Sequence, residues 1–288
     1  MTEHFFLRRI RQNPIARWYI AFVALTGKEF RVMTRYPLEF AAGFVQVFLI
    51  MAVLVFASLM FTPATSQSSH DKLLVSGILV YGFVLFIFIT EIVWNMGYNL
   101  RKEQRQGTLE QLYLTPAPVS AVLFSRLAIS LIWTAFLCSI SLWLMVALVG
   151  SLPFANPSAA LLVFVLSLSS ICGVGLMLAA LSFFVKEAAQ TVATVVQFGF
   201  VVVCAPFFPF SALPRWIRWV SRLVPLSYSV DSLRAALMGY PRGYPELASA
   251  RIELLIIATS GLLLPLIGMR LYRHAETQAR RTGTLGAY

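Results

Sequence analysis

The chain has 288 residues, of which 59% are hydrophobic and 12% are charged, and its mean hydropathy is +0.78. A soluble domain carries roughly 25% charged residues, so this composition excludes one and predicts an all-α, polytopic membrane protein. The net charge of +11 would suggest nucleic acid in a soluble protein. Here the cations lie at the ends of apolar runs, where anionic lipid headgroups explain them. We therefore expect membrane lipid and no nucleic acid as a partner.

Residues 1–37 form a basic N-terminal segment that is too charged to span a membrane. Its apolar side chains fall on a helical stripe opposite its cations; the stripe is Trp18, Phe22, Leu25 and Met33, and the cations are Lys28, Arg31 and Arg35. This pattern predicts an amphipathic helix that lies in the inner headgroup layer. The segment contains no short apolar core with a cleavage site, so we expect no signal peptide.

Six apolar runs predict a transmembrane domain over residues 38–270, because each run is near the ~20 residues that a bilayer requires. The expected spans are about 38–61, 73–98, 121–149, 158–185, 189–210 and 252–270. With both termini in the cytoplasm, sixteen of the 23 Lys and Arg residues lie on the cytoplasmic side, as the positive-inside rule requires. Residues 271–288 are expected to form a basic cytoplasmic tail, which is flexible from residue 275 onward.

Glu91, Asn95 and Asn99 recur every fourth residue near the inner end of the second span, so they share one helix face. Polar side chains inside a span are costly and invite a functional interpretation. One interpretation is that the three residues line a substrate entrance. The other is that Glu91 pairs with Arg126 and fixes two helices together. Gln197 is expected to hydrogen-bond between helices, and the small residues of the fourth span to permit close helix packing.

Residues 101–118 are the one substantial polar segment on the cytoplasmic side between two spans. Gly107 breaks an incoming helix, Thr108 and Gln111 form a capping box, and Pro116 ends the new helix. The helix has roughly seven residues, fewer than the ~12–15 that hold together alone in water. It therefore needs a surface to lie against; the alternative is a simple capped turn.

Prolines organise the segment 204–239. Pro206 and Pro209 are expected to break or kink the end of the fifth span. Two short helices follow, the first beginning at Leu213-Pro214 and ending at Pro225, the second closing at Gly239.

The first of these short helices has the pattern of an interfacial helix. Its arginines, Arg215, Arg218 and Arg222, share one face and are expected to point toward water or phosphate, with Trp216 and Trp219 at the borders of the apolar face. In the second helix, Asp231 and Arg234 are spaced to pair at i,i+3.

Two strings in these segments resemble the ABC transporter type 2 permease family of drug, lipid and polysaccharide exporters. The first is E-x-x-x-GTLE-x-L-x-x-TP at 103–116, and the second is FP-x-S-x-LP-x-W followed by P-L-S-Y-x-V-D-x-x-R at 208–234. Many relatives have an acidic residue where this chain has Arg105, which leaves open the charge pattern that faces the partner.

The resemblance implies that the first string is a coupling helix that docks on a separate ATPase subunit. Its docking residues would be Glu103, Gly107, Thr108, Leu109, Glu110, Gln111, Leu112, Tyr113, Thr115 and Pro116. The resemblance also implies that the N-terminal amphipathic helix is a connecting helix that contacts both the ATPase and lipid. The alternative for that helix is a membrane anchor without a coupling role.

The second string, by the same resemblance, implies an outer gate made of two re-entrant helices within 211–239. The gate residues would be Pro209, Leu213, Pro214, Trp216, Trp219, Pro225, Tyr228, Asp231 and Arg234. The alternative is a rigid outer cap that only seals the bundle. Irregular backbone at membrane depth needs protein or a watery cavity to satisfy its polar groups, which favours a cavity beneath this segment.

The sequence contains no G-x-x-x-x-G-K-[ST] motif, so we expect no catalytic residue and no ATPase activity in this chain. ATP and Mg would bind to a partner ABC ATPase, in two copies. The working unit would contain a second copy of this chain, as a homodimer, or a paralogous permease. The spacing of Cys and His predicts no metal site.

The expected function is the permease subunit of an exporter in the cell inner membrane. Its substrate would be lipophilic or lipid-linked, such as a drug, a lipid or a polysaccharide, and the direction of transport rests on the resemblance. Two alternatives are a gradient-driven secondary carrier and a membrane-embedded transferase. The first needs an intramembrane ionisable relay and the second needs paired carboxylates or a His/Asp site.

Overall fold

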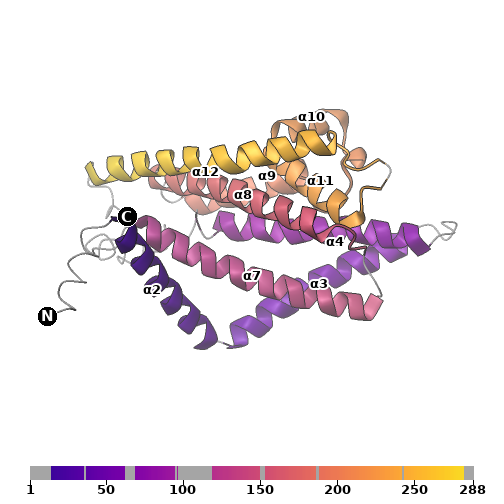
Figure 1. Cartoon of the computed structure of the whole chain (residues 1–288), viewed down its shortest axis with the longest axis horizontal. Helices are drawn as coiled ribbons and strands as arrows, with labels where there is room; N and C mark the ends of the chain where they lie inside the picture. The colour runs from indigo at the N-terminus through magenta and orange to yellow at the C-terminus, as the bar shows by residue number, and fades with distance from the viewer. Residues whose placement is uncertain are drawn as a thin grey trace.

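The computed structural model describes residues 14–35, 37–61, 69–94, 96, 119–149, 153–185, 188–241 and 243–281. These residues form an all-helical bundle, as the composition predicts (Figure 1). The helices are α2 (Pro14–Arg35), α3 (Pro37–Phe61), α4 (Ser69–Val93), α7 (Val119–Val149), α8 (Pro157–Val185), α9 (Ala189–Val203), α10 (Arg215–Leu223), α11 (Pro225–Met238) and α12 (Ala250–Arg281), with a short 3-10 turn, η3 (Phe210–Ala212).

Four of the described helices contain stretches that are long and apolar enough to cross a membrane. These stretches are Ser76–Val93, Ser120–Ala147, Pro157–Val185 and Ala250–Ala279. The two other predicted spans coincide with α3 and α9, whose apolar stretches, Ala41–Ala57 and Gln190–Val203, are shorter. The 15 residues of α9 rise only about 22 Å, less than the ~30 Å apolar layer of a bilayer. Four spans are therefore supported, and the prediction of six stays a prediction.

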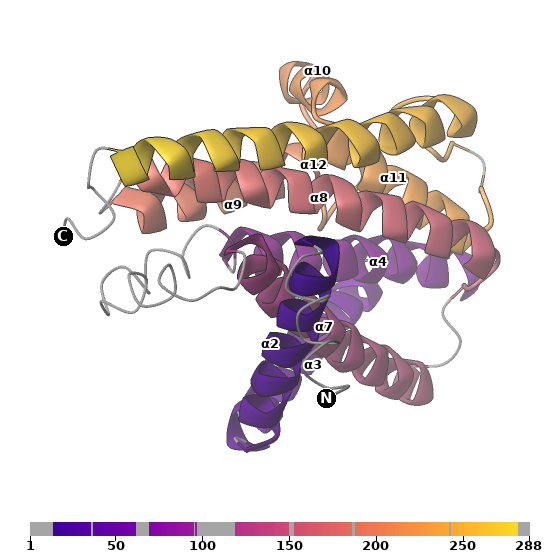
Figure 2. The ribbon, with the colours of Figure 1, turned by 60° about the vertical axis from the view of Figure 1, so that its left-hand side comes forward.

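Helix α4 is the centre of the bundle, because it contacts α3, α7, α8, α9 and α11. Its side chains Val80, Leu85, Ile89 and Ile92 are fully buried. In Figure 2, α12 and α8 run side by side above α4, whereas α2 runs downward below α4 and contacts α7 and α3. The described core is thus formed mainly around the second predicted span.

Helices α8 and α12 make the most extensive helix–helix contact of the described residues. Small residues allow this close approach, as predicted for the fourth span: a Cβ atom on Gly173 would lie 2.5 Å from the Pro265 backbone nitrogen. A Cβ on Gly268 would likewise lie 2.5 Å from the Gly173 carbonyl oxygen. Glycine at both positions lets the two backbones meet, which is the usual device of membrane helix packing.

Pro265 interrupts the hydrogen-bond ladder of α12, since proline has no N–H to donate to the carbonyl of Gly261 one turn earlier. The hydroxyl of Ser169 on α8 donates to that carbonyl oxygen at 2.6 Å. In an apolar medium a free carbonyl costs several kcal/mol. The serine of one helix therefore satisfies the proline defect of the other, and this ties α8 to α12.

Helix α2 confirms the predicted N-terminal helix but places its aromatic residues differently. Trp18 stacks on Phe22, with ring centroids 5.2 Å apart, and meets Phe124 of α7 edge-on at 6.3 Å. The indole N–H of Trp18 also donates to the Ser120 hydroxyl at 3.2 Å. Trp18, the first residue of the stripe, therefore faces the start of α7.

Among the described side chains of α2, the large apolar ones that stay exposed are Tyr19, Ile20, Val23 and Phe30. They are the side chains available to contact lipid.

The flexible tail predicted from residue 275 onward is wrong for residues 275–281. Helix α12 continues to Arg281, and Ala275 and Ala279 are buried together with Tyr272. The ring of Tyr272 lies against Phe183 of α8, with centroids 5.8 Å apart. One face of α12 stays buried beyond the apolar run. The helix therefore continues past residue 270, the predicted end of the sixth span.

Candidate functional site

The described part of the candidate site is the segment 204–239, and it begins where α9 breaks. The fifth span was predicted to reach residue 210, but α9 ends at Val203. Ala205 adopts a positive φ of 48°, and Pro206 and Pro209 follow, so the helix cannot continue. The prediction that these prolines break the helix is confirmed, and the helix ends seven residues before residue 210, the predicted end of the span.

Arg234 of α11 satisfies the backbone carbonyl groups that this break leaves free. Its guanidinium donates to the carbonyl oxygens of Ala205 at 2.8 Å, Pro206 at 2.7 Å and Phe208 at 3.2 Å. A fourth bond, from Nε, reaches the carbonyl oxygen of Ile78 on α4 at 2.8 Å. Arg234 is fully buried. One side chain therefore joins α11, α4 and the broken end of α9.

Gly82 of α4 makes room for this arginine. A Cβ atom at Gly82 would overlap both the guanidinium of Arg234 and the carbonyl oxygen of Pro206. A buried guanidinium is tolerated only where its N–H groups are satisfied, and here four carbonyl oxygens satisfy them.

Asp231 does not hydrogen-bond to Arg234, contrary to the predicted pair. Its Oδ2 accepts from the backbone N–H groups of Glu246 at 2.7 Å and Leu247 at 2.8 Å. Asp231 therefore holds the loop between α11 and α12 rather than its neighbour on the helix.

Glu253 at the start of α12 makes a second link to α11. Its carboxylate accepts from the Ser232 hydroxyl at 2.6 Å and from the Ala248 N–H at 3.1 Å. The carboxylate of Glu246 accepts from the N–H of Ser211, the middle residue of η3. Together these bonds fasten α11, the following loop and α12 into one unit.

Helix α10 is amphipathic, as predicted, and begins after Leu213-Pro214. Trp216 and Trp219 are 70% and 68% exposed, and Arg222 lies over the ring of Trp219 at 5.7 Å. The large exposed rings suit a helix that lies in the interface of a membrane. Pro225 is the first residue of α11, and the hydroxyl of Tyr228 donates to the Arg222 carbonyl at 2.8 Å.

The outward direction predicted for the Arg218 side chain of α10 is wrong. Its guanidinium turns inward and donates to the carbonyl oxygens of Phe210 at 3.1 Å, Ser211 at 2.7 Å and Leu213 at 3.2 Å. These carbonyls belong to the turn that precedes α10. Arg218 therefore caps this turn and does not point toward phosphate or bulk water.

Helix α11 ends as predicted at Gly239, which has a left-handed φ of 77°. The side chains from Leu226 to Met238 are all buried, and α11 contacts α4, α8 and α12. Such a helix re-enters the bundle, whereas α10 stays on its surface (Figure 2).

Glu91 accepts a hydrogen bond from the Ser130 hydroxyl of α7, which links the end of α4 to α7. The side chain of Arg126, its predicted partner, lies outside the described residues. One turn away, the indole N–H of Trp94 donates to Gln197 of α9 at 2.9 Å. The interhelical role predicted for Gln197 is thereby confirmed.

These bonds favour helix fixation over a polar lining for Glu91. Asn95 and Asn99 lie outside the described residues, so the proposed shared face stays a prediction. The predicted coupling residues, Glu103 to Pro116, also lie outside the described residues. The structure therefore does not test their expected role, which rests on the resemblance described above.

Sequence reasoning missed the two groups that hold the re-entrant unit together. Gly82 is one glycine in an apolar run, and Arg234 was assigned to Asp231 because that spacing is common on helices. The partners of Arg234 are backbone carbonyls, which every residue has, so no side-chain pattern marks them. The one available signal was the position of Arg234 among apolar neighbours, where a cation needs several acceptors.

The apolar bundle with a re-entrant segment defines a multi-pass membrane protein. Comparison with known families matches residues 20–238 to the ABC-2 type transporter family. The match covers most of the chain, which therefore belongs to this family and is a membrane permease subunit. The chain is also 26% identical over 220 residues to ycf38 of Porphyra purpurea, which is named as a transport permease, over 73% of this chain and 72% of the relative.

Permeases of the ABC-2 type are transport subunits without an ATPase domain, and the family implies that a partner ATPase hydrolyses ATP. The predicted resemblance to the type 2 permeases is thereby confirmed. The match includes both strings on which the resemblance was based, at 103–116 and at 208–234.

Proposed function

We propose that this permease exports a lipophilic or lipid-linked substrate, using ATP hydrolysed by two copies of a separate ABC ATPase. The observation that carries the proposal is the family match over 20–238, which extends across the segment that would dock on the ATPase and the segment that would gate the outer side. This favours an ATP-driven transporter over a gradient-driven carrier or a transferase. The direction of transport follows from resemblance to exporters.

In the proposed topology, α3 and α9 complete six spans and both termini lie in the cytoplasm of a cell inner membrane. The N-terminal segment 1–37, the transmembrane domain 38–270 and the tail 271–288 then form three regions. The distribution of Lys and Arg supports this orientation, since sixteen of 23 fall on the cytoplasmic side. Helix α9 begins the fifth membrane crossing. After the break that follows it, α10 and α11 would complete the outer half of that crossing.

We place the coupling helix at 107–116, between α4 and α7. The packing of α2 supports a role for α2 and α7 in coupling, because the Trp18 indole donates a hydrogen bond to Ser120 in the first turn of α7. A push on the coupling helix would therefore reach α7 and α2 together, and α4 from the other side. The connecting-helix role of α2 is favoured over that of a passive anchor.

We propose that α10 and α11 form an outer gate that moves as one unit with α4. Movement of α11 within its own subunit is opposed by hydrogen bonds. Arg234 donates four of them to backbone carbonyl oxygens, and the carboxylates of Asp231 and Glu253 accept others. Opening would then occur between two permease copies, as each carries its own rigid α4–α11 unit. This proposal combines the two interpretations of the segment 211–239, an outer gate and a rigid cap. The segment is rigid within one permease copy, and the segments of the two copies separate from each other.

The test is transport by the full chain, reconstituted in vesicles with its partner ABC ATPase. We expect ATP-dependent, vanadate-sensitive movement of a fluorescent lipophilic drug or lipid analogue toward the side opposite the ATPase. ATP-independent movement driven by an ion gradient would contradict the proposal.

The gate is tested in the same vesicles with Trp219→Cys, an exposed position on α10. Cross-linking the two copies at this position with a short bifunctional reagent should stop transport, whereas modification with a monofunctional reagent of similar size should not. Undiminished transport with complete cross-linking would show that α10 does not move apart during the cycle.

A further inference from the structure

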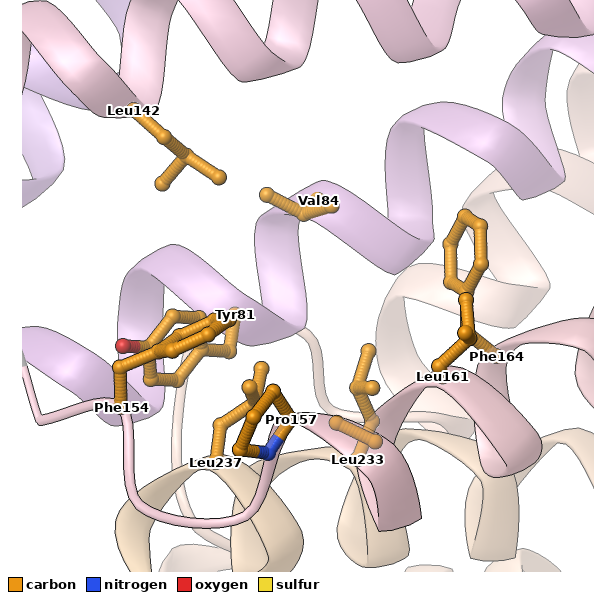
Figure 3. Close-up of a pocket in the computed structure, with 10 residues that line it drawn as sticks. Tyr81, Val84, Leu142, Phe154, Pro157, Leu161, Phe164, Leu233 and Leu237 are labelled. Atoms are coloured by element: carbon orange, nitrogen blue, oxygen red, sulfur yellow. The ribbon is translucent and has the colours of Figure 1, made fainter.

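A pocket of about 220 Å³ opens between α4, α7, α8 and α11. Figure 3 shows side chains from these helices converging on one space, with Phe154 entering from the segment that precedes α8. The lining residues are Tyr81, Val84, Leu142, Phe154, Pro157, Ala160, Leu161, Phe164, Leu233 and Leu237.

The lining is almost entirely apolar. Tyr81 is the one lining residue with a polar side-chain group, and its hydroxyl donates to the carbonyl oxygen of Pro153. That bond satisfies the hydroxyl within the protein. A cavity without polar partners does not hold ordered water, so the occupant that suits this pocket is a hydrocarbon.

Exposed apolar side chains surround the mouth of the pocket. Phe154 and Leu161 on its rim are 65% and 63% exposed, and Leu161 belongs to the candidate span Pro157–Val185. At 1.5 Å per residue, the lining residues of α8 lie within about 10 Å of the start of that helix. The mouth therefore faces the acyl-chain layer in one half of a bilayer whose apolar thickness is ~30 Å.

We propose that this pocket binds one acyl chain of a membrane glycerophospholipid. An empty cavity would forfeit packing contacts on all its walls, and acyl chains surround its mouth. No lining side chain has a free polar group that could select a headgroup, so the pocket recognises the chain alone. The inference does not depend on which substrate is transported.

An acyl chain here would also support the re-entrant helix. Leu233 and Leu237 of α11 form one wall of the pocket and are both buried, and Arg234 lies between them in sequence. The lipid chain would fill the space between α11 and α7, a helix on the opposite side of the pocket. It would thus complete the packing of the proposed α4–α11 unit.

The test uses the purified full chain in nanodiscs of phosphatidylethanolamine and phosphatidylglycerol, with a trace of phosphatidylcholine that carries a diazirine in one acyl chain. After irradiation, labelled residues are mapped by mass spectrometry. We expect label on the pocket residues Leu161, Leu233 and Leu237.

Ala160→Phe fills the pocket from α8, and Leu142→Trp fills it from α7. We expect labelling of α11 to fall about tenfold in either variant, because each methylene group excluded from the pocket weakens binding several-fold. Val165→Phe is the matched control, since Val165 is an exposed residue of α8 outside the pocket, and its labelling of α11 should equal that of the wild type.

Two results would overturn the proposal. One is equal labelling of α11 in the wild type and in both filled variants, which would place the photoreactive chain elsewhere. The other is wild-type label confined to exposed residues, with chemical cross-links showing a second copy of the chain over the pocket. Failure of transport in the reconstituted system would leave this labelling pattern unchanged, so the two proposals fail separately.

Discussion

Replacing Gly82 by alanine is expected to destabilise the protein by about 3 kcal/mol or more, since it disrupts a buried, hydrogen-bonded charge. The new Cβ would overlap the guanidinium of Arg234 and the carbonyl oxygen of Pro206. Arg234 would have to give up bonds that join α11 to the broken end of α9. For a chain of this size, the melting temperature of the purified protein in detergent should fall by about 6–12 °C.

Gly199→Ala is the matched control for this prediction. Gly199 lies in α9, and a Cβ atom there would meet no heavy atom within 4 Å. Because alanine favours a helix over glycine by about 0.5–1 kcal/mol, this variant should melt at or slightly above the wild-type temperature. If Gly82→Ala behaved as Gly199→Ala does, the proposed fixation of Arg234 would be wrong.

Replacing Gly173 by alanine, and more strongly by leucine, is expected to push α8 and α12 apart. A Cβ at this position would meet the backbone of α12, where it would overlap the Leu264 carbonyl carbon and lie 2.5 Å from the Pro265 nitrogen. A backbone cannot rotate away as a side chain can, so the alanine variant should cost about 1–3 kcal/mol by overpacking. Hydrogen–deuterium exchange within 250–281 should become faster in both variants, with leucine showing the larger effect.

Gly43→Ala provides the control, because its Cβ would lie at an ordinary contact distance of 3.5 Å from Leu137 Cδ1. Exchange in α12 should then be the same as in the wild type. Unchanged exchange in Gly173→Leu would mean that the helix contact is not as close as the structure has it.

Apolar run length was a reliable guide to the long helices, because the thickness of a bilayer directly sets how many apolar residues a span needs. It was less reliable at helix ends. The run that contains α9 stays apolar to residue 210, although the backbone turns after Val203. Conversely, α12 continues past its apolar run, because Tyr272, Ala275 and Ala279 form a buried stripe at helical spacing. That second signal was present in the sequence.

The candidate site was predictable in its outline and not in its bonds. Prolines and glycine marked the start and end of α10 and α11, since both residues act through local backbone geometry. The directions of Arg218 and Arg234 were not predictable, because both bind backbone carbonyls, which no side-chain pattern marks. The carbonyls that Arg218 binds lie in the turn just before α10, whereas those that Arg234 binds belong to segments that the tertiary fold brings near. The pocket has the same origin: its walls come from four helices, and no single stretch of sequence marks it.

The central claim is that a separate ATPase drives this permease through residues 107–116. The direct measurement is ATP hydrolysis by the partner ABC ATPase, purified with and without the full chain in nanodiscs. With Glu110→Lys or Gly107→Val, stimulation of hydrolysis and co-purification of the ATPase should both fall about tenfold, as expected for the loss of about 1.4 kcal/mol at a docking site. Gly199→Ala should retain both. If the Glu110 and Gly107 variants bind and stimulate the ATPase as the wild type does, this segment is not the coupling helix and the account is contradicted.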